Sequence, residues 1–202
     1  MTTDGLTPLS VLTFLGLIAG LGVTTLLGTF SLILKRGDVA RLIAAFAGGG
    51  VGLYCALLVV ASLTSKDRML APGDEKHICE VDCHLAYSVV GVVTQGSRYV
   101  VTVKVRFDET TISPHRGMGP LWPNSRYVAV VDGRGRRYES PSDGLRRQLV
   151  PGESYTTDLI FELPSDACDL RLMLASGDIE TPFLIGHENS FFHGKTTFRL
   201  QT

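Results

Sequence analysis

Two long stretches of apolar residues occupy the first third of the sequence, and apolar and polar positions alternate in much of the remaining two thirds. The first stretch covers residues 8–34 and the second covers residues 42–63, and neither contains an acidic or basic side chain. About twenty apolar residues are enough for a helix to cross the hydrocarbon core of a bilayer. The pattern therefore predicts a membrane hairpin of two spanning helices, followed by one globular domain.

The change in pattern also predicts where the parts of the chain begin and end. Residues 1–63 form an N-terminal tail and the hairpin, residues 64–78 form a flexible linker that contains a Pro-Gly turn signal, and residues 79–202 form the domain. The first apolar stretch is too long for the core of a signal peptide and has no basic residue before it, so we expect it to remain as a span.

Charge at the ends of the spans predicts the orientation of the hairpin. The connecting loop, residues 35–41, holds three basic residues and one acid, whereas the N-terminal tail holds Asp4 and no basic residue. Short loops rich in Lys and Arg face the cytoplasm. We therefore expect a multi-pass protein of the bacterial cytoplasmic (inner) membrane, with its C-terminal domain on the periplasmic or extracellular side.

Small residues recur at helical spacing in both spans. Gly16 and Gly20 form one G-x-x-x-G pair, and Gly48 and Gly52 form another. Such pairs allow helix backbones to approach closely inside lipid. Either the two spans pack on each other through these glycines, or the glycine face docks on another membrane protein.

Beyond the linker, period-two alternation predicts β-strands. Tyr99, Val101 and Val103 face one way in their strand, and Thr102 and Lys104 face the other. About seven strands are expected, within residues 84–94, 97–107, 127–131, 136–139, 154–163, 170–174 and 196–200. Short strands separated by turn signals indicate an all-β, immunoglobulin-like sandwich.

The order of the hairpin and turn motifs resembles that of the telokin-like, immunoglobulin-like extracytoplasmic domains of bacterial membrane-anchored proteins and lipoproteins. The segments VVDGRGRRYE and LVPGESYTTDLIFELPSD carry the likeness. The matching positions are Asp132, Gly135, Tyr138, Pro151, Gly152, Glu153, Phe161 and Pro164. The resemblance covers residues 85–202 and implies a binding or accessory module without catalysis. The insert at residues 108–126 and a cysteine pair at the domain entrance depart from that family.

The cysteine pair forms a C-x-x-x-C-H sequence at Cys79, Cys83 and His84. Thiolates and imidazole suit copper, and this spacing resembles the copper sites of oxidase subunits and their assembly factors. The hairpin-then-sandwich layout also resembles subunit II of haem–copper oxidases. However, Tyr87 and Val90 stand where the dicopper site of that subunit needs His and Met. A copper-binding or thiol-redox protein is therefore the alternative hypothesis.

A disulfide is the simpler interpretation of the same cysteines, because thiols outside the cytoplasm are oxidised. Cysteines four residues apart on an extended strand lie about 13 Å apart, which is too far to bond. Cys79 and Cys83 can therefore pair only across a tight turn. Alternatively, one of them pairs with Cys168.

Two aromatic features are candidate interaction surfaces. Trp122 is the only tryptophan and stands between prolines in the insert. It either forms an interface centre, where Trp is favoured, or folds back on its own domain. Phe191 and Phe192 are adjacent, so both cannot face the core if the chain is extended.

Composition narrows the classes of function. A net charge of −1 argues against a nucleic-acid binder, and neither a G-x-S-x-G nor a Walker A sequence occurs. We expect no cofactor and no catalysis. The sequence favours an accessory or scaffold subunit whose partners are the lipid bilayer and other membrane subunits, such as those of a respiratory or photosynthetic complex.

Overall fold

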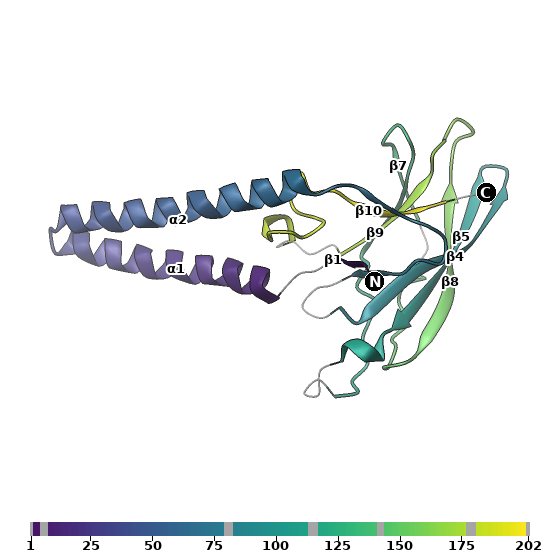
Figure 1. The fold of residues 1–202 in the computed structure, drawn as a ribbon, viewed down its shortest axis with the longest axis horizontal. Coiled ribbons are helices and arrows are strands. Elements are labelled where there is room, and N and C mark those ends of the chain that lie inside the picture. The colour runs from purple at the N-terminus through teal and green to yellow at the C-terminus, as the bar shows by residue number, and fades with distance from the viewer. Residues whose placement is uncertain are drawn as a thin grey trace. The chain divides into compact units, whose positions relative to one another are not determined.

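The computed structural model describes residues 2–4, 8–78, 83–112, 117–140, 144–176 and 181–200. These residues divide into two compact units. One unit contains the two long helices together with segment 181–193. The other contains the β-strands (Figure 1).

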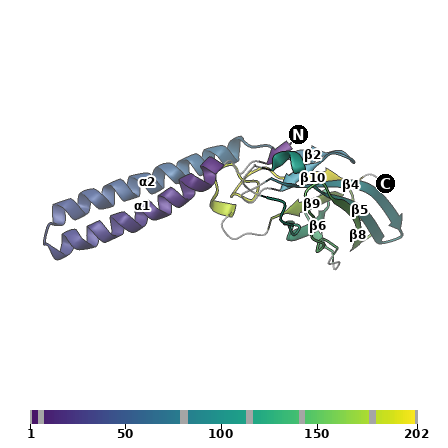
Figure 2. The ribbon, with the colours of Figure 1, turned by 90° about the horizontal axis from the view of Figure 1, so that it is seen from below.

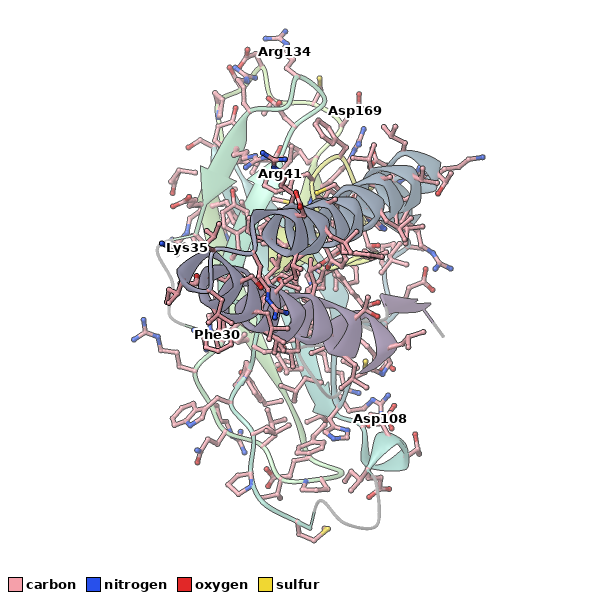
Figure 3. All side chains as sticks on the ribbon, turned by 90° about the vertical axis from the view of Figure 1, so that its left-hand side faces the viewer. Phe30, Lys35, Arg41, Asp108, Arg134 and Asp169 are labelled. Atoms are coloured by element: carbon pink, nitrogen blue, oxygen red, sulfur yellow. The ribbon has the colours of Figure 1, made fainter. Side chains whose placement is uncertain are left out.

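The helical unit is an antiparallel hairpin of α1 (Pro8–Ile33) and α2 (Gly37–Thr64). At about 1.5 Å per residue, the helices are about 39 and 42 Å long, enough to cross a hydrocarbon core of about 30 Å. Both are apolar enough to span a membrane, and most of their side chains are exposed, as lipid contact requires. Figure 3 shows Lys35 at the turn between them and Arg41 near the start of α2. The predicted hairpin is confirmed, and α2 begins five residues before the predicted span.

Contact between the helices does not run through the predicted glycines. A Cβ added at Gly28 would lie 3.9 Å from Cγ2 of Ile43 on the other helix. A Cβ added at each of the four predicted positions, Gly16, Gly20, Gly48 and Gly52, would meet no atom within 4 Å outside its own helix turn. The interpretation that these glycines pack the spans together is therefore wrong. Their docking on another membrane protein stays a prediction.

The threonine hydroxyl groups in the spans are satisfied within their own helix. The side chains of Thr13 and Thr25 donate to the carbonyls of Leu9 and Leu21, each at 2.7 Å. Thr29 and Thr64 make the same bond to the residue four positions earlier. Since lipid offers no partners for polar groups, these bonds make the threonines compatible with a membrane span.

The second unit is a sandwich of two five-stranded sheets. Sheet A contains, in spatial order, β1 (Thr2–Asp4), β3 (Lys76–Ile78), β4 (Leu85–Gln95), β5 (Arg98–Phe107) and β8 (Ser154–Glu162). Sheet B contains β2 (Arg68–Leu70), β10 (Thr196–Arg199), β9 (Arg171–Ala175), β6 (Tyr127–Val131) and β7 (Arg137–Glu139). A short 3₁₀ helix, η1 (Glu109–Thr111), lies in a connection of this unit, and a second, η2 (Thr181–Phe183), belongs to the helical unit.

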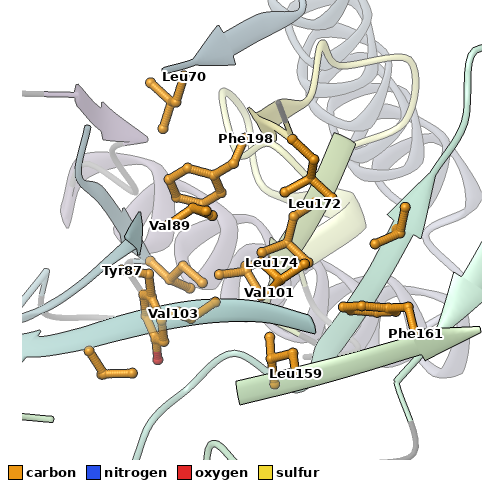
Figure 4. Packing of buried hydrophobic residues seen from close by; sticks show 14 of the residues in the cluster. Leu70, Tyr87, Val89, Val101, Val103, Leu159, Phe161, Leu172, Leu174 and Phe198 are labelled. Atoms are coloured by element: carbon orange, nitrogen blue, oxygen red, sulfur yellow. The ribbon is translucent and has the colours of Figure 1, made fainter. Parts of the chain in front are cut away.

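The core of the sandwich comes from the alternating positions read in the sequence. Val101, Val103 and Leu159 of sheet A are fully buried, as are Leu172 and Phe198 of sheet B. All belong to one cluster (Figure 4). Each sheet therefore buries one face against the other, which confirms the predicted all-β sandwich.

Three short strands were not predicted, and two of them lie in the expected linker. β2 pairs with β10, and β3 pairs with β4. Residues 66–78 therefore belong to the sandwich unit rather than to a flexible tether, and Thr64 is the last residue of α2. The N-terminal tail also joins it, because β1 pairs in parallel with β3. Strands of three residues are too short to show an alternation, which explains why the sequence pattern did not reveal them.

One glycine is required by close backbone approach. A Cβ on Gly194 would lie 2.6 Å from the carbonyl oxygen of Lys66 and 2.7 Å from the amide nitrogen of Asp67. Only a residue without a side chain fits where the chain enters β10 beside β2.

Candidate functional site

A network of charged side chains lies at one end of sheet A. The strand register places His77 of β3 opposite Ala86 of β4, and Ala86 opposite Arg106 of β5. Directly paired residues point to the same face of a sheet, so His77 and Arg106 share a face with the small Ala86 between them. Asp108 is two residues after Arg106 and points the same way. Figure 3 shows Asp108 beside η1.

The carboxylate of Asp108 is the centre of this network. It lies 3.3 Å from Nε2 of His77 and 3.2 Å from Nη2 of Arg106. It also accepts hydrogen bonds from the amide and the hydroxyl of Thr110. Burial by itself raises the pKa of Asp108, but the hydrogen bonds from Thr110, Arg106 and His77 outweigh it and hold the pKa well below its usual range. Asp108 is therefore ionised.

Arg106 extends the network to Glu75 through two parallel hydrogen bonds of 2.6 and 2.9 Å. The hydrogen bond from Arg106 lowers the pKa of Glu75 despite partial burial. Asp108 is buried and neutralised by Arg106, whose side chain remains 30% exposed. The network connects β3, β5 and η1, and this role is structural.

His84 packs beside this network. Its ring stacks on Phe107 with centroids 5.6 Å apart, and Nδ1 lies 2.6 Å from the hydroxyl of Thr111. Cys79 lies outside the described residues. Within the described part of the chain, no group of three or more His, Cys, Asp or Glu side chains is arranged to hold a metal ion. The copper site at Cys79, Cys83 and His84 stays a hypothesis without support from the described residues.

The free cysteines of the described chain are Cys55 and Cys168, both exposed. The predicted pairing through Cys168 is therefore wrong. A bond between Cys83 and Cys79 stays a prediction, because Cys79 is not among the described residues.

The end of the insert at residues 108–126 is held by a buried tyrosine. The hydroxyl of Tyr87 donates to Oδ1 of Asn124 at 2.8 Å and accepts from the backbone amides of Asn124 and Ser125 at 2.9 and 3.2 Å. Two backbone hydrogen bonds of 2.9 Å also join Leu121 and Leu149. The residues on both sides of Trp122 are thus fixed to the sandwich.

Trp122 itself is 60% exposed. It lines a groove of about 430 Å³ together with Pro123, Ser125, Arg126, Tyr127, Val128, Glu139, Ser140, Leu145 and Arg146. Of the two predicted placements, the structure favours a presented indole over one folded into the domain. An exposed aromatic ring on a rigid base loses little conformational entropy on contact, which suits a binding site.

A row of arginines crosses the outer face of sheet B, and sequence reasoning missed it. The register pairs Arg199 of β10 with Arg171 of β9, Arg171 with Val131 of β6, and Val131 with Arg137 of β7. These side chains share one face. Among the described residues, none of the three arginines forms an ion pair with a carboxylate. A groove of about 260 Å³ lies along this row and is lined by Arg171, Arg137 and Arg68.

The sequence contains these arginines, but it does not show that they form a row without the register of the strands. Each arginine occupies a polar position of a separate strand, and only strand pairing shows that they are neighbours. Two grooves thus lie along β6, one at Trp122 and one along the arginines. Tyr127 and Val131, both on β6, line the first and the second groove respectively.

The motif residues of the β6–β7 hairpin have a structural role. Asp132 is buried and accepts from the backbone amides of Arg134 and Arg136 and from the guanidinium of Arg136. The hydroxyl of Tyr138 donates to the same carboxylate at 3.3 Å. Gly135 adopts a φ of 78°, which favours glycine. The motif therefore encodes a turn rather than a reactive site.

The structure places Phe191 and Phe192 in the helical unit, not in the sandwich. Both are exposed, and the ring of Phe191 packs edge-on against Phe183 with centroids 5.6 Å apart.

No protein-family model matches the sequence, and no curated protein matches it. The resemblance to the telokin-like family therefore stays a prediction beyond the β-sandwich itself. Among solved structures, the chain is similar to MPT63, a secreted protein from Mycobacterium tuberculosis, with a TM-score of 0.44 and 11% sequence identity. The match covers 68% of this chain and 100% of that chain.

Proposed function

We propose that this protein is a non-enzymatic, membrane-anchored accessory or scaffold subunit. Its helical hairpin spans the cytoplasmic membrane, and its β-sandwich is presented on the outer side for binding to another protein. The observation that supports this best is the rigidly held, exposed Trp122 beside a groove on sheet B.

The topology of the chain supports the same side for both ends of the hairpin. β1 precedes the first span and β3 follows the second, and these two strands pair. Two antiparallel spans return the chain to the side on which it started. The pairing is therefore compatible with a hairpin that crosses the membrane twice and incompatible with a single crossing.

The positive charge of sheet B indicates which chemical groups the partner surface would carry. Arg137, Arg171 and Arg199 offer planar donors that match carboxylates. We propose that the partner surface has an acidic patch facing these arginines and an apolar pocket for Trp122. Opposite charges at such an interface raise the association rate and make it sensitive to salt.

Site-specific photo-crosslinking in native membranes tests this proposal. A photoreactive amino acid replaces Trp122 in the full chain, and the control carries it at Val93, which is exposed on the outer face of sheet A. We expect one discrete adduct of higher mass from position 122 and none from position 93. The yield of the adduct should decrease as the salt concentration is raised, and also when Arg137 and Arg171 are both changed to Glu. Equal labelling at both positions, or none at 122, would refute the proposal.

A further inference from the structure

Segment 181–193 belongs to the membrane hairpin although it follows most of the sandwich in sequence. The hydroxyl of Tyr54 in α2 donates to the carbonyl oxygen of Phe183 at 2.6 Å, across 129 residues of sequence. Tyr54 is buried, and so are Leu58 and Ser62 on the same face of the helix. Figures 1 and 2 both show this yellow segment beside the C-terminal part of α2.

The contact lies at a definite height along the spans. Tyr54 is 17 residues after Gly37, the first residue of α2, which corresponds to about 26 Å of helix. The hydrocarbon core is about 30 Å thick and the uncharged stretch begins only at Leu42, about 18 Å of helix before Tyr54, so Tyr54 lies in the outer half of the core. The ring of Phe14 in α1 is at the same height, 6.3 Å from that of Tyr54. Apolar residues continue to Leu63, so the segment contacts a part of α2 that is still apolar.

In this segment apolar side chains are exposed and polar side chains are buried, which is the reverse of an ordinary surface loop. Three phenyl rings are exposed: Phe183 and Phe191 by about half, and Phe192 by 77%. His187, Glu188 and Ser190 are buried instead. Polar residues usually face water, and clustered apolar side chains usually do not. The arrangement therefore matches a surface whose solvent is lipid.

Several polar groups of the segment are hydrogen-bonded within it. The amide of Ser190 donates to the carbonyl of His187 at 2.9 Å, and the amide of His193 donates to that of Ser190 at 3.1 Å. The hydroxyl of Ser190 donates to the carbonyl of Leu184, and Nδ1 of His187 accepts from the amide of Asn189 at 3.0 Å. Non-helical backbone near membrane depth requires this kind of internal pairing.

The backbone at Phe192 adds one further observation. Its φ is 64°, in the left-handed region that bulky residues rarely adopt. This conformation occurs at the residue whose ring is the most exposed of the three. The turn that is closed by the hydrogen bond from the amide of His193 to the carbonyl of Ser190 holds this conformation.

We infer that segment 181–193 is a third membrane contact, which inserts Phe183, Phe191 and Phe192 at the boundary between acyl chains and headgroups of the outer leaflet. The inference rests on the proposed membrane anchorage of the hairpin. Continuity with the apolar face of α2 argues for phospholipid as the occupant, rather than a second copy of the chain.

Tryptophan reporters in reconstituted vesicles test the inference. In a Trp122→Phe background, three full-length variants each carry one tryptophan: Phe192→Trp, Leu26→Trp in the middle of α1, and Val93→Trp in sheet A. Each is placed in phosphatidylcholine vesicles with ordinary or brominated acyl chains, because bromine quenches only indoles in contact with it. We expect quenching and a blue-shifted emission for Phe192→Trp and Leu26→Trp, and neither for Val93→Trp.

The reporters distinguish failure of the third contact from failure of the anchorage. Quenching of Leu26→Trp without quenching of Phe192→Trp would overturn the third membrane contact and leave the anchorage intact. Absence of quenching in both would overturn the anchorage as well. A third outcome is a blue shift of Phe192→Trp without quenching, which disappears when the protein is diluted in lipid. This outcome would show contact between copies of the chain and would also overturn the inference.

Discussion

Removing the hydroxyl of Tyr87 should destabilise the sandwich and loosen the base of Trp122. The side chain is fully buried, and its hydroxyl makes three hydrogen bonds to Asn124 and Ser125. Tyr87→Phe retains the ring and its packing. It leaves two backbone amides and one amide oxygen without this partner.

The expected loss of stability comes from the two backbone amides and the amide oxygen that no longer bond to the hydroxyl. An unsatisfied buried polar group costs about 1–3 kcal/mol, and of the two residues that lose a bond Ser125 is buried whereas Asn124 is only partly enclosed. We therefore expect the free energy of unfolding to fall by about 2 kcal/mol. For a domain of about 130 residues, this corresponds to a decrease of several degrees in the melting temperature, roughly 5–10 °C.

Thermal and urea unfolding of the full chain in detergent micelles measure this loss. Emission from Trp122 reports on the insert, and circular dichroism reports on the sheets. The matched control is Tyr99→Phe, because the hydroxyl of Tyr99 forms no hydrogen bond with the described residues, and its removal should leave the midpoint unchanged. If Tyr87→Phe unfolds at the wild-type midpoint, or if Tyr99→Phe loses as much, the hydrogen bonds of Tyr87 do not stabilise the insert.

Two further predictions concern pH and thiols. The pKa values of Asp108 and Glu75 are lowered by folding, so the stability that these carboxylates contribute is present above their unfolded pKa values of about 4 and is lost as the pH falls through the folded values. The urea midpoint should therefore decrease below about pH 4, and it should decrease less steeply in Asp108→Asn. An identical slope in that variant would contradict the role given to the network. Mass spectrometry of the denatured chain after alkylation should find two modified cysteines without reduction and all four after it, whereas four before reduction would show that Cys79 and Cys83 do not pair.

The sequence was most informative where one physical requirement acts along many consecutive residues. Lipid demands apolar side chains over a whole span, so both helices were visible as uncharged stretches. A sheet with one buried face demands alternation, so long strands such as β5 and β8 were visible as well. β1, β2 and β3 are three residues each, and their pairing is decided by partners distant in the chain.

The candidate sites show the same limit. Trp122 could be selected from composition and its neighbouring prolines, but Tyr87, which holds its base, could not. The arginines of sheet B occupy ordinary polar positions until the register aligns them. Phe191 and Phe192 were recognised as an apolar pair, whereas their association with Tyr54 depends on a fold that brings residues 54 and 183 together.

The parallel pairing of β1 with β3 links biosynthesis of the chain to its insertion. Residues 2–4 emerge from the ribosome before either span, and residues 76–78 emerge after both. In the proposed topology, their pairing requires that both strands lie on the same side of the membrane, and therefore that both helices have entered the bilayer. A chain in which one helix failed to insert would keep the two strands in different compartments and leave β3 with an open sheet edge, a known starting point for aggregation. In this topology, completion of sheet A thus distinguishes correctly inserted molecules from misinserted ones.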